Sequence, residues 1–148
     1  MGTDRRGAEL RIRSTELPLS GGVGTSPRAR DHTRAFLDAR TPPLAPAVAE
    51  DVLIASGELV ANAVRHAPGP CVLRLTDDGM RLTVAVSDSS TEVPVPRRPD
   101  LLAGGGGFGW YLLLRIAEDV EVERDPRQGK TIRVTLPVRP ATSGHPRT

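Results

Sequence analysis

The sequence has a single cysteine, Cys71, among 148 residues. One thiol excludes an internal disulfide and a cysteine-based zinc site, and its apolar surroundings favour a buried small residue. The first nine residues are polar and charged, without the apolar core of a signal peptide. The longest nearly unbroken apolar run, Phe108 to Leu114, is too short to span a bilayer. These absences predict a cytoplasmic protein with no membrane partner.

An excess of charge of one sign is also missing. The chain has 20 basic and 18 acidic residues, a formal charge of +2, and its arginines are scattered rather than gathered into a run. Charge therefore gives no indication of direct nucleic-acid binding. The length suits one domain with one core. We expect a flexible leader over residues 1–9, a folded domain over 10–137 and a flexible tail over 138–148.

The most informative stretch is Glu58-Leu-Val-Ala-Asn-Ala-Val-Arg-His66. Residues four apart share one face of a helix, so Glu58, Asn62 and His66 form a stripe with Arg65 beside it. Polar groups on so apolar a helix need partners. In one interpretation Glu58 and Arg65 face solvent while Asn62 bonds a neighbouring loop. In the other the stripe lines a pocket, where Asn62 binds a cation such as magnesium and Glu58 accepts a proton.

The period of the apolar residues predicts the order of the elements. We expect an edge strand, two helices, a hairpin, a long loop, a further helix and a second hairpin, at about residues 10–17, 26–40, 47–66, 72–86, 88–107, 110–118 and 120–136. Hairpins indicate an antiparallel or mixed sheet. The predicted fold class is α+β, a two-layer sandwich with the helices on one face of the sheet.

The long loop ends in a glycine run whose spacing imitates a dinucleotide-binding motif. Gly104, Gly106 and Gly109 have that spacing, but a proline-rich loop precedes them where the motif requires a strand, so we reject this interpretation. The bare amides of the run and the helix opening at Gly109 can still bind a phosphate. The alternative is a hinge without a ligand. Asp88, at the mouth of the loop, either caps a turn or accepts a hydrogen bond from an exocyclic amine.

Three segments in order resemble the conserved boxes of the GHKL (Bergerat-fold) ATPases. Residues 58–66 resemble the N box, Val86-Ser-Asp88 the G1 box and residues 107–119 the G2 box, with Gly129-Lys-Thr131 resembling the closing segment. The small size of the chain and the residues of its N box are similar to those of the anti-sigma-factor serine/threonine kinases of actinobacteria. The resemblance covers about residues 10–137.

At the phosphate end, the resemblance implies that Asn62 coordinates the magnesium ion that bridges the phosphates of ATP. It implies that Glu58 is the catalytic base that deprotonates a serine of a partner protein. His66 would lie near the phosphates, and Gly107 and Gly109 would belong to the lid that closes over them.

At the base end, the resemblance implies that Asp88 binds the adenine amino group and that Thr131 supports it. Ser90 departs from the family pattern, which commonly has glycine there, and three prolines occupy the following loop. Neither difference removes a chemical group that the reaction needs.

The predicted function is therefore that of an ATP-binding regulator. It would bind a sigma factor and phosphorylate an anti-anti-sigma protein, and the resemblance extends to a homodimer formed through the first strand and helix. The alternative is a nucleotide-gated binding module with little or no kinase turnover. A detached histidine-kinase catalytic domain is a third hypothesis, weakened because no phosphoacceptor histidine on a paired helix is visible.

Overall fold

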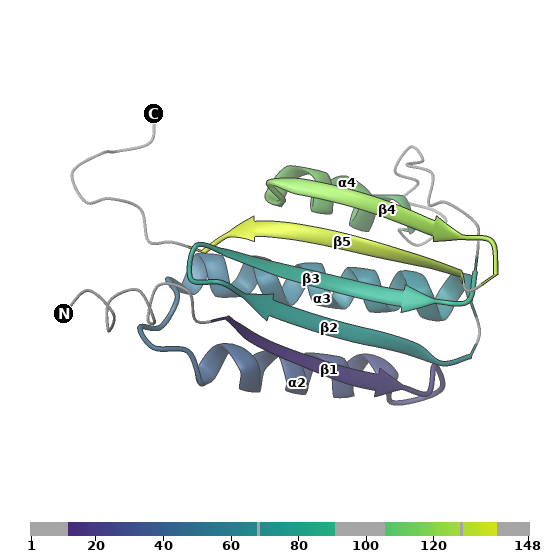
Figure 1. Cartoon of the computed structure of the whole chain (residues 1–148), viewed down its shortest axis with the longest axis horizontal. Helices are drawn as coiled ribbons and strands as arrows, with labels where there is room; N and C mark the ends of the chain where they lie inside the picture. The colour runs from purple at the N-terminus through teal and green to yellow at the C-terminus, as the bar shows by residue number, and fades with distance from the viewer. Residues whose placement is uncertain (1–11, 68, 91–105, 128, 139–148) are drawn as a thin grey trace.

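The computed structural model describes residues 12–67, 69–90, 106–127 and 129–138. Its elements follow the predicted order (Figure 1). They are β1 (Arg13–Leu19), α2 (Thr25–Asp38), α3 (Pro46–His66), β2 (Cys71–Asp77), β3 (Arg81–Asp88), α4 (Gly106–Ile116), β4 (Asp119–Asp125) and β5 (Gly129–Pro137). The expected leader and tail and most of the long loop lie outside the described residues.

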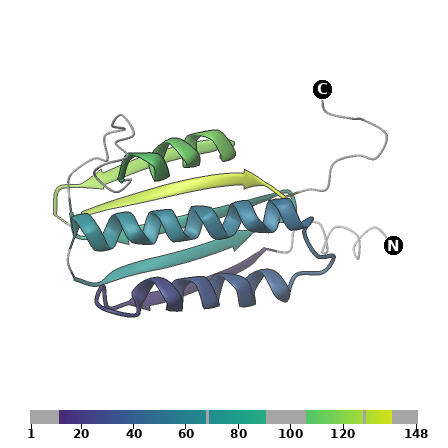
Figure 2. The same cartoon turned by 180° about the vertical axis from the view of Figure 1, so that it is seen from behind.

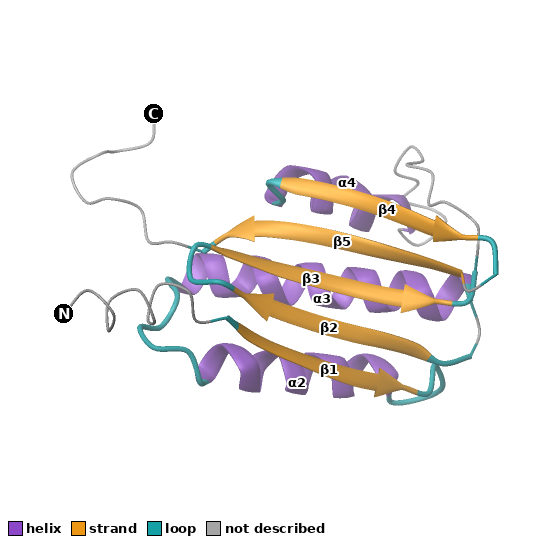
Figure 3. Ribbon diagram, in the orientation of Figure 1, coloured by secondary structure: helices purple, strands orange, loops and turns teal. Residues whose placement is uncertain are grey.

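The five strands form one sheet in the order β1-β2-β3-β5-β4 (Figure 3). Every pairing in it is antiparallel. Of the two sheet types that the sequence allowed, the antiparallel one is therefore present. Seen from behind, the three helices cover one face of the sheet (Figure 2). The predicted α+β two-layer sandwich is confirmed.

The core lies between that face and α3. Successive side chains of β3 and of β5 point to opposite faces of the sheet, one set toward the helices and the other toward the uncovered face. The buried apolar residues of these strands on the helix-facing side are Leu82, Val84, Val86, Ile132, Val134 and Leu136. Leu59 and Val60 of α3 are buried with them. Full burial of such a side chain contributes roughly 1.5–3 kcal/mol.

Two helix starts differ from the sequence-based boundaries. Helix α2 begins at Thr25, one residue earlier than predicted, after Gly24 with φ 89°, and no side chain caps it. Helix α4 begins at Gly106 and not at Trp110. Glycine is a poor helix former, which is why the sequence placed this start too late. Strand β1, in contrast, begins at Arg13, later than predicted.

None of the helices in the described part of the chain is both long and apolar enough to cross a membrane.

Candidate functional site

Glu58 lies where α3 meets α4. Its side chain is half-buried. A Cβ atom built on Gly109 would lie 1.7 Å from Glu58 Oε1 and 2.5 Å from its Cδ. The carboxyl group therefore occupies the space that any side chain at position 109 would need. A glycine in α4 lets the acid approach the backbone of that helix, and this contact joins the predicted N and G2 boxes.

Asn62 lies one turn further along the same face of α3. Its Oδ1 atom is buried and has no hydrogen-bond partner in the described part of the chain. An unsatisfied buried acceptor costs about 1–3 kcal/mol, so most such atoms have a partner. The amide oxygen is also a ligand of the kind that Mg²⁺ prefers. The residue thus fits a cation that would be held here together with phosphate and water oxygens.

The protein alone supplies few further ligands for a metal ion. Among the described residues, no group of three or more His, Cys, Asp or Glu side chains could hold one. Mg²⁺ commonly binds through one or two protein oxygens plus substrate phosphates, and a single amide oxygen agrees with that habit. His66 and Arg65 follow at the C-terminal end of α3, and both are exposed. A cation at that helix end is favoured by the helix dipole.

Asp88 ends β3 in a buried ion pair. Lys130 Nζ lies 3.1 Å from Asp88 Oδ1 and 2.9 Å from Oδ2, and each side chain is 1% exposed. The backbone N–H of Ser90 donates to Oδ1 at 2.8 Å. Removing one partner of a buried pair leaves an uncompensated charge and costs about 3–5 kcal/mol. Lys130 therefore neutralises the carboxylate that the sequence assigned to base recognition.

Lys130 is not among the predicted site residues, although the sequence contains a signal for it. Lys130 is the only lysine of the chain, and it lies two residues before the buried Ile132, on the inward side of β5. The structure pairs it with Asp88 across the β3–β5 ladder. An inward-pointing lysine needs an acid, and only the register of the strands shows which one.

Thr131 lies on the other face of the sheet. Its Oγ1 is 2.7 Å from the Oγ of Ser87, its cross-strand partner. The side chain that contacts Asp88 is that of Lys130. The support of Asp88 by Thr131 that the resemblance implies stays a prediction.

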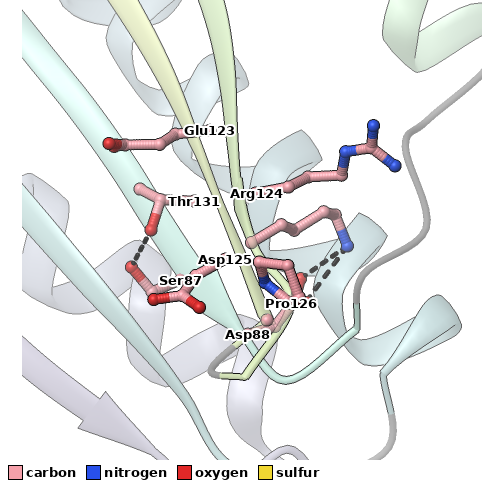
Figure 4. Close-up of a pocket in the computed structure, with 9 residues that line it drawn as sticks. Ser87, Asp88, Glu123, Arg124, Asp125, Pro126 and Thr131 are labelled. Carbon is pink, nitrogen blue, oxygen red and sulfur yellow. Dashed lines mark hydrogen bonds and ion pairs between the residues drawn. The ribbon is translucent and has the colours of Figure 1, made fainter.

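A cavity of about 400 Å³ opens at this end of the sheet (Figure 4). It is lined by Ser87, Asp88, Glu123, Arg124, Asp125, Pro126, Gly129, Lys130 and Thr131. Gly129 has φ 113°, and a Cβ atom on it would lie 1.9 Å from the backbone oxygen of Asp88. Only glycine fits this turn, and its close approach places Lys130 beside Asp88.

The predicted site segments gather at one end of the domain. The C-terminal end of α3, the end of β3, the start of α4 and the turn between β4 and β5 all lie at the right in Figure 1. Gly107 belongs to the first turn of α4, and Gly109 to the same helix. The structure thus places the ends of four elements at one end of the domain, although the sequence separates them widely. The cavity is lined by Asp88 and Thr131 but not by Glu58, Asn62, His66 or Gly109.

Comparison with known proteins matches residues 24–136 to the family model of the histidine kinase-like ATPase domain. All predicted site residues fall within that match. No relative was found among curated proteins.

A comparison with solved structures gives two matches to this chain. A crystal structure of the RsbU and RsbW domains of Rv1364c from Mycobacterium tuberculosis has a TM-score of 0.61 at 18% identity, covering 87% of this chain and 34% of that one. A histidine kinase domain from the blue-light activated histidine kinase of Erythrobacter litoralis has a TM-score of 0.49 at 18% identity, covering 77% and 59%. The chain thus spans about a third of the mycobacterial chain and under two thirds of the other.

Proposed function

Because this chain belongs to the histidine kinase-like ATPase domain family, we propose that it is an ATP- and magnesium-binding regulator. We propose further that it acts as an anti-sigma-factor serine kinase in the cytoplasm, binding a sigma factor and phosphorylating a serine of an anti-anti-sigma partner. The observation that carries the proposal is the buried, unpartnered Oδ1 of Asn62, one helical turn from Glu58. An orphaned oxygen next to an acid supports a metal–nucleotide site better than a structural role.

Each candidate site residue would have a separate role in phosphoryl transfer. This reaction needs positioning and charge neutralisation more than covalent chemistry. Asn62 would hold magnesium, which when bound neutralises phosphate charge. Glu58 would accept the proton of the serine hydroxyl, and its place against Gly109 holds the carboxylate on one side of the site. His66, Gly107 and Gly109 would border the phosphates, and the exposed position of His66 leaves it accessible.

At the base end, Asp88 would bind the purine, since its carboxylate lines the cavity and is held in place by Lys130 and the Ser90 amide. Thr131 lines the same cavity from the opposite face of the sheet and would contribute a hydroxyl there.

The partner classes come from the resemblance of the N box to anti-sigma-factor kinases. The fold shared with a chain that contains an RsbW domain agrees with it. A homodimer through β1 and α2 belongs to the same proposal, and nucleic acid and membrane do not take part in it.

The first test is calorimetric titration with ATP, with and without magnesium. The wild type should bind in a magnesium-dependent manner. Asn62→Ala should lower the affinity only when magnesium is present, because it removes a metal ligand. Asp88→Ala should lower it in both conditions, because it removes a base contact. Unchanged binding by both folded variants would contradict the site.

A second function is favoured by one observation. The Asp88 carboxylate is already engaged by Lys130 and by the Ser90 amide, and Ser90 replaces the usual glycine. Such a site could bind ATP only to set partner affinity, without turnover. Glu58→Gln separates the two functions. Loss of phosphate transfer to a serine protein with ATP binding retained supports the kinase, whereas a wild type that never labels a serine protein supports the binding module.

A further inference from the structure

The buried pair of Asp88 and Lys130 still has unused hydrogen-bonding capacity. An ammonium group has three N–H donors. Lys130 Nζ lies within hydrogen-bond distance of both oxygens of Asp88, which engage at most two of these donors, and the structure records no acceptor for the remaining N–H in the described part of the chain. A carboxylate oxygen accepts about two hydrogen bonds. Oδ1 accepts from Lys130 and Ser90, whereas Oδ2 accepts from Lys130 alone. The pair therefore offers one donor and one acceptor side by side.

The capacity lies next to space for a ligand. Asp88 and Lys130 both line the cavity of about 400 Å³, which is of the size of a small-molecule site. Their side chains are 1% exposed. A hydrogen bond made in so shielded a place discriminates strongly between ligands, because a ligand that leaves a buried polar group unpaired is rejected.

We propose that Lys130 is a specificity-determining residue that lets the base site accept a 6-oxopurine as well as adenine. This inference rests on the proposed nucleotide site. A lone carboxylate favours the adenine amine and repels the O6 of guanine or hypoxanthine, since both groups are acceptors. Lys130 supplies a donor for O6, while Asp88 Oδ2 accepts from the N1–H of the same base. Adenine fits the same pair through its amine and N1, in the reverse order.

The first experiment uses the wild-type protein and a series of nucleotides. Dissociation constants for ATP, GTP, ITP and purine riboside triphosphate are measured by calorimetry with magnesium. We expect GTP and ITP to bind within about tenfold of ATP, and the purine analogue, which has no group at position 6, to bind more weakly than all three. A preference for ATP over both GTP and ITP of more than about a hundredfold overturns the inference.

The second experiment changes the donor. Lys130→Met removes the ammonium at similar length, and we expect the affinity for GTP and ITP to fall at least about tenfold more than that for ATP. Lys130→Arg is the matched control, because it keeps the charge and the donors and should retain binding of 6-oxopurines. If Lys130→Met fails to fold, the nucleotide series with wild type and Lys130→Arg still decides. An unchanged ratio of ATP to GTP affinity in a folded Lys130→Met variant shows a purely structural pair.

The outcomes also distinguish this inference from the proposed function. If no nucleotide binds, the nucleotide site itself is wrong. If ATP binds in an Asp88-dependent manner while GTP and ITP do not, only the role given to Lys130 fails.

Discussion

The residue whose environment says most about function is Asn62. Its buried Oδ1 lacks a partner in the described part of the chain, which costs stability in the absence of a ligand. We expect Asn62→Ala to leave the free energy of unfolding of the ligand-free protein unchanged or to raise it by about 1 kcal/mol, since alanine is also the better helix former. Urea denaturation measures this. A loss of more than about 2 kcal/mol would mean that the amide has a structural partner.

At this scale the sequence predicts which single residues belong to the candidate site more readily than it predicts which side chains contact each other. Helical spacing alone put Glu58 and Asn62 on one face, because residues of one helix are in fixed relation. Asp88 and Lys130 lie 42 residues apart, and their contact depends on the register of β3 with β5. Alternation shows which side chains point inward but not which residue lies opposite. The ion pair of Asp88 with Lys130 could therefore not be predicted from the sequence. The same holds for the lack of a hydrogen-bond partner at the Asn62 oxygen.

At the scale of elements, the approach of α3 to α4 depends on Gly109. A Cβ atom there would lie 1.7 Å from Glu58 Oε1, the far end of a flexible side chain that can move away. We expect Gly109→Ala to fold, with ATP affinity within a few-fold of wild type, but with phosphate transfer lowered by roughly 10- to 100-fold because the base is displaced. A transfer assay with the purified acceptor measures this.

Gly57 offers a matched control in α3. It is exposed, and a Cβ atom on it would meet nothing within 4 Å. Gly57→Ala should stabilise the domain by up to about 1 kcal/mol through helix propensity and leave transfer unchanged. Equal transfer rates in the two alanine variants would show that the contact of Glu58 with Gly109 has no role in catalysis.

The turn between β2 and β3 gives a prediction for pH. The backbone N–H groups of Arg81 and Met80 donate to Asp78 Oδ1 at 2.8 and 2.9 Å, and these bonds, that of Arg81 first, lower the pKa of the Asp78 carboxyl below its ordinary value of 3.8. A lowered folded-state pKa stabilises the protein above the unfolded-state pKa, and this contribution disappears as pH falls through the folded value.

Asp78→Asn keeps the acceptor oxygen and removes the titration. The difference in the free energy of unfolding between wild type and variant should be constant above about pH 5 and should shift against the wild type below about pH 4. Urea denaturation across that range measures it. A difference that stays constant down to pH 2 would show that Asp78 titrates alike in the folded and unfolded chain.

Boundaries of elements were the least predictable part of the fold. All eight elements were expected in order, because period and turn residues are local signals. Helix α4 begins at Gly106, however, within a run of poor helix formers that the sequence favoured as loop. The family resemblance predicts that this glycine run and Glu58 belong to one site. Local helix propensity does not predict this. Tertiary packing overrides propensity where a close approach requires glycine.

At the scale of the whole molecule, the candidate site and an exposed ion pair lie at opposite ends of the sheet. The site residues lie where β3 ends, whereas the ion pair of Arg81 with Glu118, at 2.8 Å, lies where β3 begins. Both partners of that pair are about half exposed. An exposed pair contributes little to stability, and this one lies at the other end of β3 from Asp88. It therefore provides a control that shares the fold but not the site.

A ligand that binds only the folded chain stabilises the whole domain. At magnesium–ATP concentrations about 100 times the dissociation constant, the free energy of unfolding should rise by about 2.7 kcal/mol. The thermal midpoint of a domain of this size should then rise by roughly 5–10 °C. Scanning calorimetry with and without the nucleotide measures the shift. Glu118→Gln should show the full shift, and Asn62→Ala only a small part of it. Equal shifts in these two variants would place the nucleotide away from α3, and an absent shift in the wild type would remove the nucleotide from the proposed function altogether.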